Sequence, residues 1–443
     1  MASPGPLLCA SGLAALSAAV LSACLPAAPV FEAPDAGTSG DAAVGSDGSM
    51  NTSVDASVDA TDAMSATDAT SPTDGPVTPA SIGVGLAASC ALMADKTVEC
   101  WGSNVIGSLG ADGPPDAFAY VPQPVPGLTH VVSLAVGSSH ECAVIEGGVV
   151  TCWGSGGEGE LGIMSDNEDV PTPIQSLEYE DGGTMGTVVA GNNHTCAIAA
   201  DGVTLWCWGY YGGVETTSSS TVPTYLATLE APAVTMAAGT DVTCELDVNG
   251  AVWCWGQNLQ GVLGQGSAVA PGASVVTPVR VAVGAPVAQL AVGGSTACVV
   301  TTSHDLVCWG DDTESQLGPI TLPDPDAGSY VASPIALPIA PGHVTKVGCG
   351  DSHTCALFDD GGIQCWGYNY DGELGIAAPP NGSLYPVSVP NLGPATDLSV
   401  HYESACATLV GGGVACWGND ANGQLGAGML PTMPIGAQPV TFP

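Results

Sequence analysis

Fourteen of the seventeen cysteines fall into seven pairs with nearly constant spacing, and spaced cysteines can form disulfides or metal sites. The members of a pair lie ten residues apart, or eleven in the third pair. Turn residues such as Asp360-Gly361 often stand midway, so each pair would face across a β-hairpin. Opposed residues in antiparallel strands lie about 4.5–5.5 Å apart at Cα, within reach of a disulfide. We therefore predict disulfides Cys90–Cys100, Cys142–Cys152, Cys196–Cys207, Cys244–Cys254, Cys298–Cys308, Cys355–Cys365 and Cys406–Cys416.

Metal binding is the alternative use of these residues. Three histidines stand two residues before a paired cysteine, namely His140, His194 and His353, and a ring of them could hold a transition metal. However, the CxxC spacing of zinc sites is missing and the thiols should be oxidised. We predict no metal and no cofactor. Cys349 has no repeat partner, so it is either a buried free thiol or a reactive site, while Cys9 should leave with the leader.

Common catalytic patterns are missing from the chain. It contains no GxSxG, HExxH or Walker loop, and the glycine-rich stretch 153–162 fits a repeated turn. A sialidase-like site would need several arginines, and Arg280 is the only one. We expect no catalytic residues and a protein that is not an enzyme. The alternative is an extracellular polysaccharide hydrolase or lyase, because a facing pair among 43 acidic residues would leave no sequence signature.

The charge balance is strongly acidic. Asp and Glu number 43 against Lys96, Arg280 and Lys346, which gives a formal net charge of −40. Three cations cannot neutralise several phosphates, so nucleic acid is excluded as a partner. An anionic membrane surface would repel the chain as well. The charge would attract basic partners or divalent cations, or it serves only to keep the surface soluble.

The second cysteine of each pair begins a repeated Cys-Trp-Gly. Its tryptophans are Trp101, Trp153, Trp208, Trp255, Trp309, Trp366 and Trp417, at spacings of 52, 55, 47, 54, 57 and 51 residues. A period near 50 residues is typical of a propeller blade of four short strands. We therefore predict an all-β fold, a seven-bladed β-propeller of four-stranded antiparallel blades, over residues 81–443.

Further landmarks place strands and turns inside each unit. A glycine lies five residues before the first cysteine, except that His401 replaces it in the seventh unit. The apolar run Val131–Val136 before this glycine predicts an inner strand. The hairpin between the cysteines should have a three-residue loop, or a two-residue Asp201-Gly202 turn in the third unit. Prolines such as Pro278 should begin the outer strand, whose edge is unpaired.

These units resemble the regulator-of-chromosome-condensation repeat family, whose pattern includes Trp-Gly, Asn-x-x-Gly-Gln-Leu-Gly and then Pro. Unit seven reads CWGNDANGQLG and unit six reads GDSHTCALFDDGGIQCWGYNYDGELG. The third unit departs from the pattern, since YYGGVETT replaces its Leu-Gly, and the paired cysteines are a departure throughout. The resemblance implies a closed propeller. It implies less about function, since such propellers include an exchange factor for a small GTPase, chromatin-binding and ubiquitin-ligase modules, and β-lactamase inhibitors.

The N-terminal residues predict export. Residues 7–23 are apolar or small and end in Leu21-Ser22-Ala23-Cys24, which resembles a bacterial lipoprotein signal, although no Lys or Arg precedes it. The resemblance implies lipidation of Cys24 and anchoring to the cell envelope, at the outer membrane or cell surface. An uncleaved anchor or an ordinary secretory signal are the alternatives. Residues 1–24 would be the signal and 25–80, rich in Ala, Asp, Ser and Thr, a disordered linker.

The function we expect is a monomeric, envelope-anchored scaffold that binds an unknown protein ligand at the cell surface. The segment after Trp-Gly should lie on one face in every blade, and it carries Tyr210, Tyr211, Tyr368 and Tyr370. Tyrosine is favoured at protein interfaces, which makes these four our candidate contact residues. Ordinary loop packing is the alternative for them. Exchange-factor-like activity is disfavoured by export and charge, and membrane contact is expected only through the N-terminal lipid.

Overall fold

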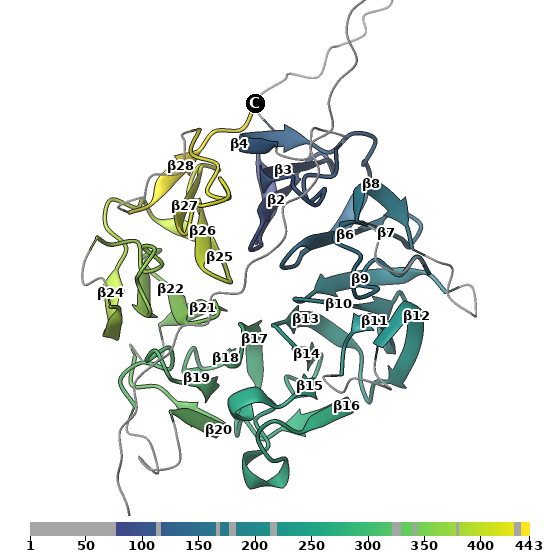
Figure 1. Cartoon of the computed structure of the whole chain (residues 1–443). Coiled ribbons are helices and arrows are strands. Elements are labelled where there is room, and N and C mark those ends of the chain that lie inside the picture. The colour runs from purple at the N-terminus through teal and green to yellow at the C-terminus, as the bar shows by residue number, and fades with distance from the viewer. Residues whose placement is uncertain are drawn as a thin grey trace, which may run out of the picture. The chain divides into compact units, whose positions relative to one another are not determined.

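The computed structural model describes residues 77–111, 117–164, 169–176, 183–212, 219–320, 329–339, 343–377, 381–428 and 436–443. They form seven four-stranded antiparallel sheets arranged as blades around a ring (Figure 1). In each sheet the four strands follow one another in sequence order from the centre outward. The predicted all-β propeller with seven blades is confirmed.

The strand bounds follow the repeat. Blades 1 to 3 comprise β1 (Pro79–Val84), β2 (Ala88–Met93), β3 (Val98–Ser103), β4 (Phe118–Pro124); β5 (Val131–Val136), β6 (His140–Ile145), β7 (Val149–Gly154), β8 (Val170–Gln175); β9 (Met185–Ala190), β10 (His194–Ala199), β11 (Thr204–Tyr210) and β12 (Ser219–Thr228). Blades 4 and 5 comprise β13 (Ala233–Ala238), β14 (Val242–Asp247), β15 (Val252–Gln257), β16 (Ser274–Val281); β17 (Val287–Val292), β18 (Thr296–Thr301), β19 (Leu306–Asp311) and β20 (Tyr330–Ala336). Blades 6 and 7 comprise β21 (Val344–Cys349), β22 (His353–Phe358), β23 (Ile363–Gly367), β24 (Ser383–Ser388); β25 (Ala395–His401), β26 (Ser404–Leu409), β27 (Val414–Gly418) and β28 (Gln438–Val440). Two 3₁₀ turns, η1 (Leu259–Gly261) and η2 (Gly266–Ala268), lie between β15 and β16.

Each cysteine pair lies directly opposite on the second and third strands of its blade. In blade 2, for example, Cys142 is the register partner of Cys152. The seven predicted disulfides are all present, with Cα atoms 4.0–4.1 Å apart. Nearly all of the paired cysteines are fully buried. The bonds therefore stabilise the interior of each blade and do not link one blade to another.

Two local expectations were wrong. In the third blade Gly202 N–H donates to the Ala199 carbonyl at 2.9 Å, and of residues 201 and 202 only Gly202 has a positive φ (78°). This is the same turn as in the other blades, followed by one additional residue, and not a two-residue Asp-Gly turn.

The outer-strand prolines also lie within the strand. Pro278 occupies a bulge of β16, where Cys254 pairs with Val279 and Gly256 with Val275, so its missing N–H is not needed.

Neighbouring blades are joined by the repeated tryptophans, which are fully buried. In six of the seven, the indole N–H donates to the carbonyl just before the Leu-Gly motif of the preceding blade. Six such bonds measure 2.7–3.1 Å: Trp101 to Gln424, Trp153 to Ser108, Trp208 to Glu160, Trp309 to Val262, Trp366 to Gln316 and Trp417 to Glu373. Trp255 has no partner among the residues that the structure describes, and in the sequence the blade before it lacks the Leu-Gly motif.

The glycines at the ends of the inner strands let the blades approach closely around the axis. A Cβ built on Gly239 would lie 2.0 Å from the Gly293 carbonyl oxygen, and one on Gly293 would lie 2.1 Å from that of Gly350. No side chain fits at such distances. These glycines are therefore required by packing between blades.

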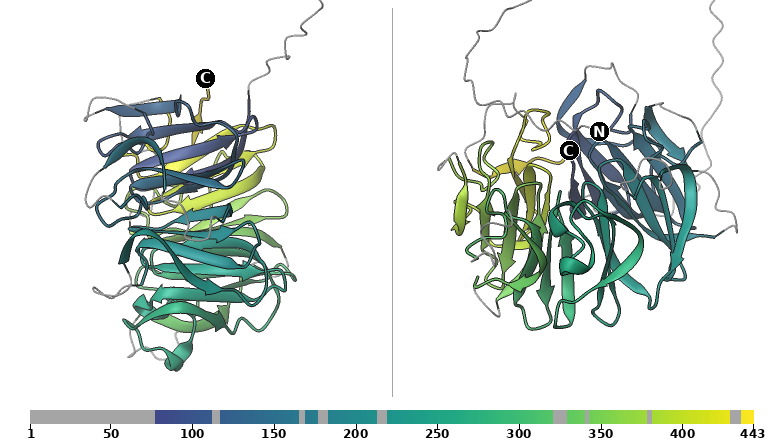
Figure 2. Two further views of the ribbon diagram at one scale, coloured as in Figure 1. Left: turned by 90° about the vertical axis from the view of Figure 1, so that its right-hand side faces the viewer. Right: turned by 60° about the horizontal axis from the view of Figure 1, so that its bottom comes forward.

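The last blade closes the ring against the first without sharing a sheet with it, since β1–β4 and β25–β28 form separate sheets. Figures 1 and 2 show yellow β28 beside the purple first blade. The junction consists of Trp101 packed with Leu425 and Val440, and of Ser89 Oγ, which donates to the Gln424 carbonyl at 2.9 Å. Ring closure therefore depends on side-chain packing.

The disulfide assignment predicts which cysteine reacts in the unfolded chain. After denaturation in urea without reductant, an alkylating reagent should modify Cys349 and none of the fourteen paired cysteines. In the native protein Cys349 should stay unmodified, because it is buried and burial raises the pKa of its thiol to about 12. Peptide mapping by mass spectrometry checks both states. Labelling of any paired cysteine without reductant would contradict the assignment.

The unequal tryptophan contacts predict unequal mutational costs. Trp309→Phe removes a buried hydrogen bond and leaves the Val262 carbonyl without its donor, whereas Trp255→Phe removes an indole N–H that has no partner among the described residues. Both changes remove the same volume. We expect Trp309→Phe to lower the free energy of unfolding by about 1–3 kcal/mol more than Trp255→Phe. Urea unfolding followed by circular dichroism measures the difference, and equal losses would refute the role of the hydrogen bond.

Candidate binding faces

The two ends of the blades form two distinct faces of the ring. We call the loop face the end that carries the connections after the first strand, such as 137–139, and after Trp-Gly, such as 368–382. We call the turn face the end that carries the hairpins between the second and third strands, such as 248–250, and the links to the next blade. Strand direction alone fixes this division, because consecutive antiparallel strands turn at alternate ends.

The predicted tyrosines do not share one environment. Tyr370 is 61% exposed, Tyr368 is partly exposed, and their rings stack with centroids 6.3 Å apart on the loop face of blade 6. Tyr210 ends β11 and is partly exposed. Tyr211 is only 8% exposed and packs with Leu229 and other core side chains of blades 3 and 4. The prediction that Tyr211 is a surface contact residue was therefore wrong.

Carboxylates surround the stacked tyrosines. Asn419 Nδ2 donates to Asp371 Oδ2 at 3.0 Å and to Glu403 Oε2 at 2.8 Å, so one amide holds carboxylates from blades 6 and 7 together. Asp351 lies nearby, and burial together with Glu403 raises its pKa to about 6. Burial and the charges of Asp371 and Glu403 raise the pKa of Glu373 to about 7. This region concentrates negative charge beside exposed aromatic surface.

The chain's three Lys and Arg residues all lie away from the loop face. Lys96 belongs to the first hairpin turn and pairs with Glu146, while Lys346 lies on inner strand β21 and pairs with Asp397. Arg280 lies near the turn-face end of β16. The carboxylates of the loop face are therefore not neutralised by any Lys or Arg of the same chain.

The central channel is crossed at its loop-face end. The inner strands line a cavity of about 290 Å³, and His401 Nε2 lies 2.9 Å from the Ala238 carbonyl of blade 4. The next residue, Tyr402, is 4% exposed with φ 47°, and its carbonyl accepts the Asp351 N–H at 2.8 Å. His401 stands where the other six units have glycine. This exception to the repeat therefore places a side chain across the channel.

Two of the three repeated histidines contact the next blade through a hydroxyl group. His140 Nε2 lies 2.9 Å from Thr195 Oγ1, and this hydroxyl donates to the Glu160 carbonyl at 2.8 Å. The hydroxyl's single hydrogen is used, so the imidazole must donate. His194 Nε2 lies 2.8 Å from Thr243 Oγ1, whereas His353 Nε2 has no partner among the described residues. Burial lowers the pKa of all three, to about 4 for His140 and about 3 for the others, so they stay neutral.

No group of three or more His, Cys, Asp or Glu side chains in the described part of the chain is arranged to hold a metal ion. The imidazoles lie between the blades and do not form the ring that was the alternative reading of the sequence. Cys349 is buried without a disulfide partner.

Sequence reasoning missed a buried acid at the junction of blades 1 and 2. Glu141 is fully buried, and neither carboxylate oxygen has a partner among the described residues. Burial raises its pKa well above the ordinary value. The repeat position of Glu141, just before the first cysteine, could have revealed its burial. Thr195 and Thr354 occupy this position in other blades, and each donates to the carbonyl that also accepts the tryptophan N–H.

The N-terminal predictions fall on residues that the structure does not describe. They are the signal over residues 1–24 with Cys24 and nearly all of the linker over 25–80. The described part begins at Val77, and β1 begins at Pro79, two residues before the expected start of the propeller. Within the residues described, no helix is long and apolar enough to cross a membrane.

The buried acid yields a prediction about pH and stability. Glu141 is protonated in both folded and unfolded chains at pH 4, but as pH rises only the unfolded chain ionises readily, so stability falls. Glu141→Thr should remove this penalty and add the hydroxyl found at other junctions. We expect the variant to exceed the wild type in free energy of unfolding by more than about 1 kcal/mol at pH 8, with the gap shrinking toward pH 4.

Urea unfolding at both pH values provides the measurement. Glu314→Thr is the matched control, since it makes the same substitution at an exposed position and should change stability little at either pH. An equal gain for both variants, or a gain for Glu141→Thr that does not depend on pH, would contradict the assignment.

Comparison with known proteins agrees with the repeat. Models described as "Regulator of chromosome condensation (RCC1) repeat" match residues 148–198, 249–300 and 304–357, and a second model of that description matches 287–316 and 344–373. The ultraviolet-B receptor UVR8 of Arabidopsis thaliana is 28% identical over 309 residues, covering 67% of each chain. Protein pim1 of Schizosaccharomyces pombe is 26% identical over 373 residues, covering 75% of this chain and 67% of that protein.

Solved structures share the fold at low sequence identity. Human WBSCR16 aligns with a TM-score of 0.67 and 21% identity over 77% of this chain and 93% of that chain. Yeast RCC1 (Prp20), solved bound to Kap60, aligns with a TM-score of 0.66 and 22% identity over 87% and 90%. Residues 148–198 and 249–373 thus match repeats of the regulator-of-chromosome-condensation family, and the described residues fold as a seven-bladed propeller.

Proposed function

We propose that this propeller is a protein-binding scaffold of the cell envelope, not an enzyme, and that its loop face at blades 6 and 7 binds a basic protein segment. One observation carries the proposal. The stacked Tyr368 and Tyr370 lie beside Asp371 and Glu403, on a face without a single Lys or Arg. Tyrosine supplies contact area at low entropic cost, and unneutralised carboxylates attract Lys and Arg side chains.

The rigidity of the ring supports a scaffold role. Disulfides inside each blade and tryptophans between blades hold the loop ends in fixed positions, so a partner meets a preorganised surface. One structurally similar propeller, yeast RCC1, was solved bound to another protein, Kap60. That likeness concerns the fold and leaves the partner of this chain to be identified by experiment.

The disulfides also support export. Seven buried disulfides form and persist in oxidising compartments, and they are rare in a reducing cytosol. Together with the leader that resembles a lipoprotein signal, they favour a monomer tethered through Cys24 and held away from the membrane by residues 25–80. In this arrangement the loop and turn faces are both open to extracellular partners.

The scaffold proposal predicts a specific pattern of binding by tyrosine variants. The full chain should bind a decalysine peptide and should not bind decaglutamate. Tyr368→Ser combined with Tyr370→Ser should weaken decalysine binding about 10-fold or more, as expected for aromatic contact residues. Tyr385→Ser is the matched control, since Tyr385 is 65% exposed on outer strand β24 of the same blade. Calorimetry at two salt concentrations measures affinity and its screening.

Charge variants locate the acidic contribution. Asp371→Asn with Glu403→Gln should weaken decalysine binding, whereas Asp359→Asn with Asp360→Asn, on the turn face of the same blade, should not.

Affinity capture from the parent cell envelope identifies the natural partner. The wild type and Tyr385→Ser should each retain a protein that the double tyrosine variant does not retain. Equal losses for both acidic pairs would show unspecific attraction to net charge and overturn the proposed face.

Polysaccharide hydrolysis is the second candidate, and one observation bears on it. Asp371 and Glu403 both lie within 3.0 Å of Asn419 Nδ2, so their carboxylates are close enough to flank a glycosidic bond. The same amide occupies the space between them, and a substrate oxygen would have to displace it. Turnover of a polysaccharide panel that disappears in Asp371→Asn or Glu403→Gln would favour this candidate over the scaffold.

A further inference from the structure

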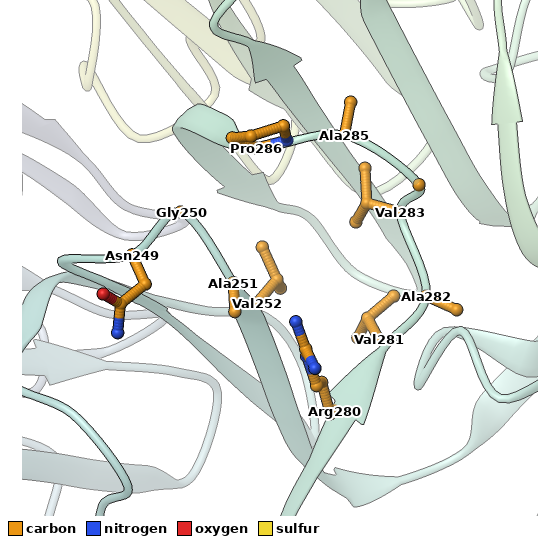
Figure 3. Close-up of a pocket in the computed structure, with 11 residues that line it drawn as sticks. Asn249, Gly250, Ala251, Val252, Arg280, Val281, Ala282, Val283, Ala285 and Pro286 are labelled. Carbon is orange, nitrogen blue, oxygen red and sulfur yellow. The ribbon is translucent and has the colours of Figure 1, made fainter.

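Cavities occur on the turn face at several places where a hairpin turn approaches a link between blades. In blade 4 the cavity has a volume of about 430 Å³ and lies between residues 249–252 and 280–286 (Figure 3). Blade 6 has one of about 520 Å³, and the junction of blades 1 and 2 has one of about 580 Å³. Blades 4 and 6 therefore repeat one hollow, between a blade's own hairpin turn and the link that follows it, whereas the hollow at the junction of blades 1 and 2 lies between the link and the hairpin turn of blade 2.

The linings differ most in charge. The blade 6 cavity contains Asp359 and Asp360, with His343 Nδ1 2.8 Å from Asp359 Oδ2. The cavity between blades 1 and 2 contains Glu146, which pairs with Lys96. The blade 4 cavity contains no acidic residue and one cation, Arg280. A lining with one cation and no acidic residue is unusual in a chain that has 43 acidic residues and three Lys or Arg.

Register shows that Arg280 is an exception at its repeat position. It pairs with Trp253, the residue before the second cysteine of the blade. The equivalent outer-strand positions in the other blades are all uncharged: Pro124, Gln175, Tyr225, Ala336, Ser388 and Pro439. The strand geometry of the propeller therefore does not require a cation at this point.

The guanidinium of Arg280 is also free to bind. Lys96 and Lys346 form ion pairs, whereas Arg280 forms none with any residue that the structure describes. Figure 3 shows its side chain rising between Val252 and Val281. A guanidinium binds a carboxylate through two parallel hydrogen bonds, which an ammonium group cannot do.

The rest of the cavity is apolar. Val252 and Val281 are buried beneath it, at 0% and 4% exposure, and Val283, Ala285 and Pro286 form the side opposite the hairpin turn. The backbone polar groups of Gly250 are already used within the protein. Its N–H donates to the Asp247 carbonyl and its own carbonyl accepts the Val287 N–H, each at 3.0 Å. A ligand that fits this lining has one anionic group for Arg280 and an aliphatic part for the accessible surface of Val283, Ala285 and Pro286.

We propose that the blade 4 cavity is a binding site for a small amphipathic monocarboxylate, with Arg280 binding the carboxylate and Val283, Ala285 and Pro286 contacting an aliphatic chain. The site lies at the opposite end of the blades from the loop face. It therefore does not depend on the protein-binding function proposed above.

Calorimetry of the full chain with three small probes tests the site. Octanoate has both required parts, acetate has only the carboxylate, and octylammonium has the same chain with the opposite charge. We expect saturable one-to-one binding of octanoate, and binding of acetate and octylammonium at least about 10-fold weaker. Equal affinity for acetate would exclude the apolar contacts, and equal affinity for octylammonium would exclude recognition of the carboxylate.

Matched variants assign the binding to Arg280. Arg280→Gln should weaken octanoate binding about 10-fold or more, and Arg280→Lys should restore part of it. Lys96→Gln removes the same charge from the turn face of blade 1 and should leave the affinity within about 2-fold, because screening weakens distant charges. Arg280 is exposed and unpaired, so its variants should unfold at the wild-type temperature. Equal effects of Arg280→Gln and Lys96→Gln, or no effect of either, would overturn the proposal.

Discussion

The contact between each tryptophan and the preceding blade is the constraint on which the ring depends. A blade of this propeller consists of four consecutive strands, and this holds for the first and last blades as well. Among the described strands, none from one end of the chain completes a sheet at the other end. What joins neighbours is an apolar face centred on a buried indole, whose N–H must reach a carbonyl in the adjacent blade because an unpartnered buried donor costs free energy.

This constraint explains why the Leu-Gly segment is part of the repeat. The carbonyl before it accepts the indole of the next blade, and at three junctions a hydroxyl donates to the same oxygen, from Ser89, Thr195 or Thr354. The departures from the repeat affect this network locally. Blade 3 lacks the motif and Trp255 has no acceptor among the described residues, while Glu141 replaces a hydroxyl by a buried acid. Each departure alters one junction while the others keep their contacts, as expected for nearest-neighbour stabilisation in repeat proteins.

Features that depend on contacts within one unit could be predicted from the sequence. The disulfides connect residues ten or eleven positions apart on one hairpin, so spacing alone determines the pairing. Contacts between units were harder, because they depend on how two copies pack. The prediction of Tyr211 as a surface residue failed because its burial depends on packing between blades 3 and 4. Its repeat position, three residues after the tryptophan, carries Asn104 and Asn258 in other blades, whose side chains turn inward to accept the Leu109 and Leu263 N–H groups. Aligning the units position by position would have identified it as buried.

The proposed sites lie where the repeat constrains the side chains least. Inner strands and indoles are determined by packing, whereas the ends of the third and fourth strands vary from blade to blade without disturbing the junctions. Acids and tyrosines collect at the loop end of blades 6 and 7, while the one arginine lies at the turn end of blade 4. The strands between these ends are held by a buried disulfide in each blade, and rigid elements with a single arrangement do not transmit a conformational change. Occupancy of one face should therefore leave the other face unchanged, which makes the propeller a support for independent sites and not a switch between them.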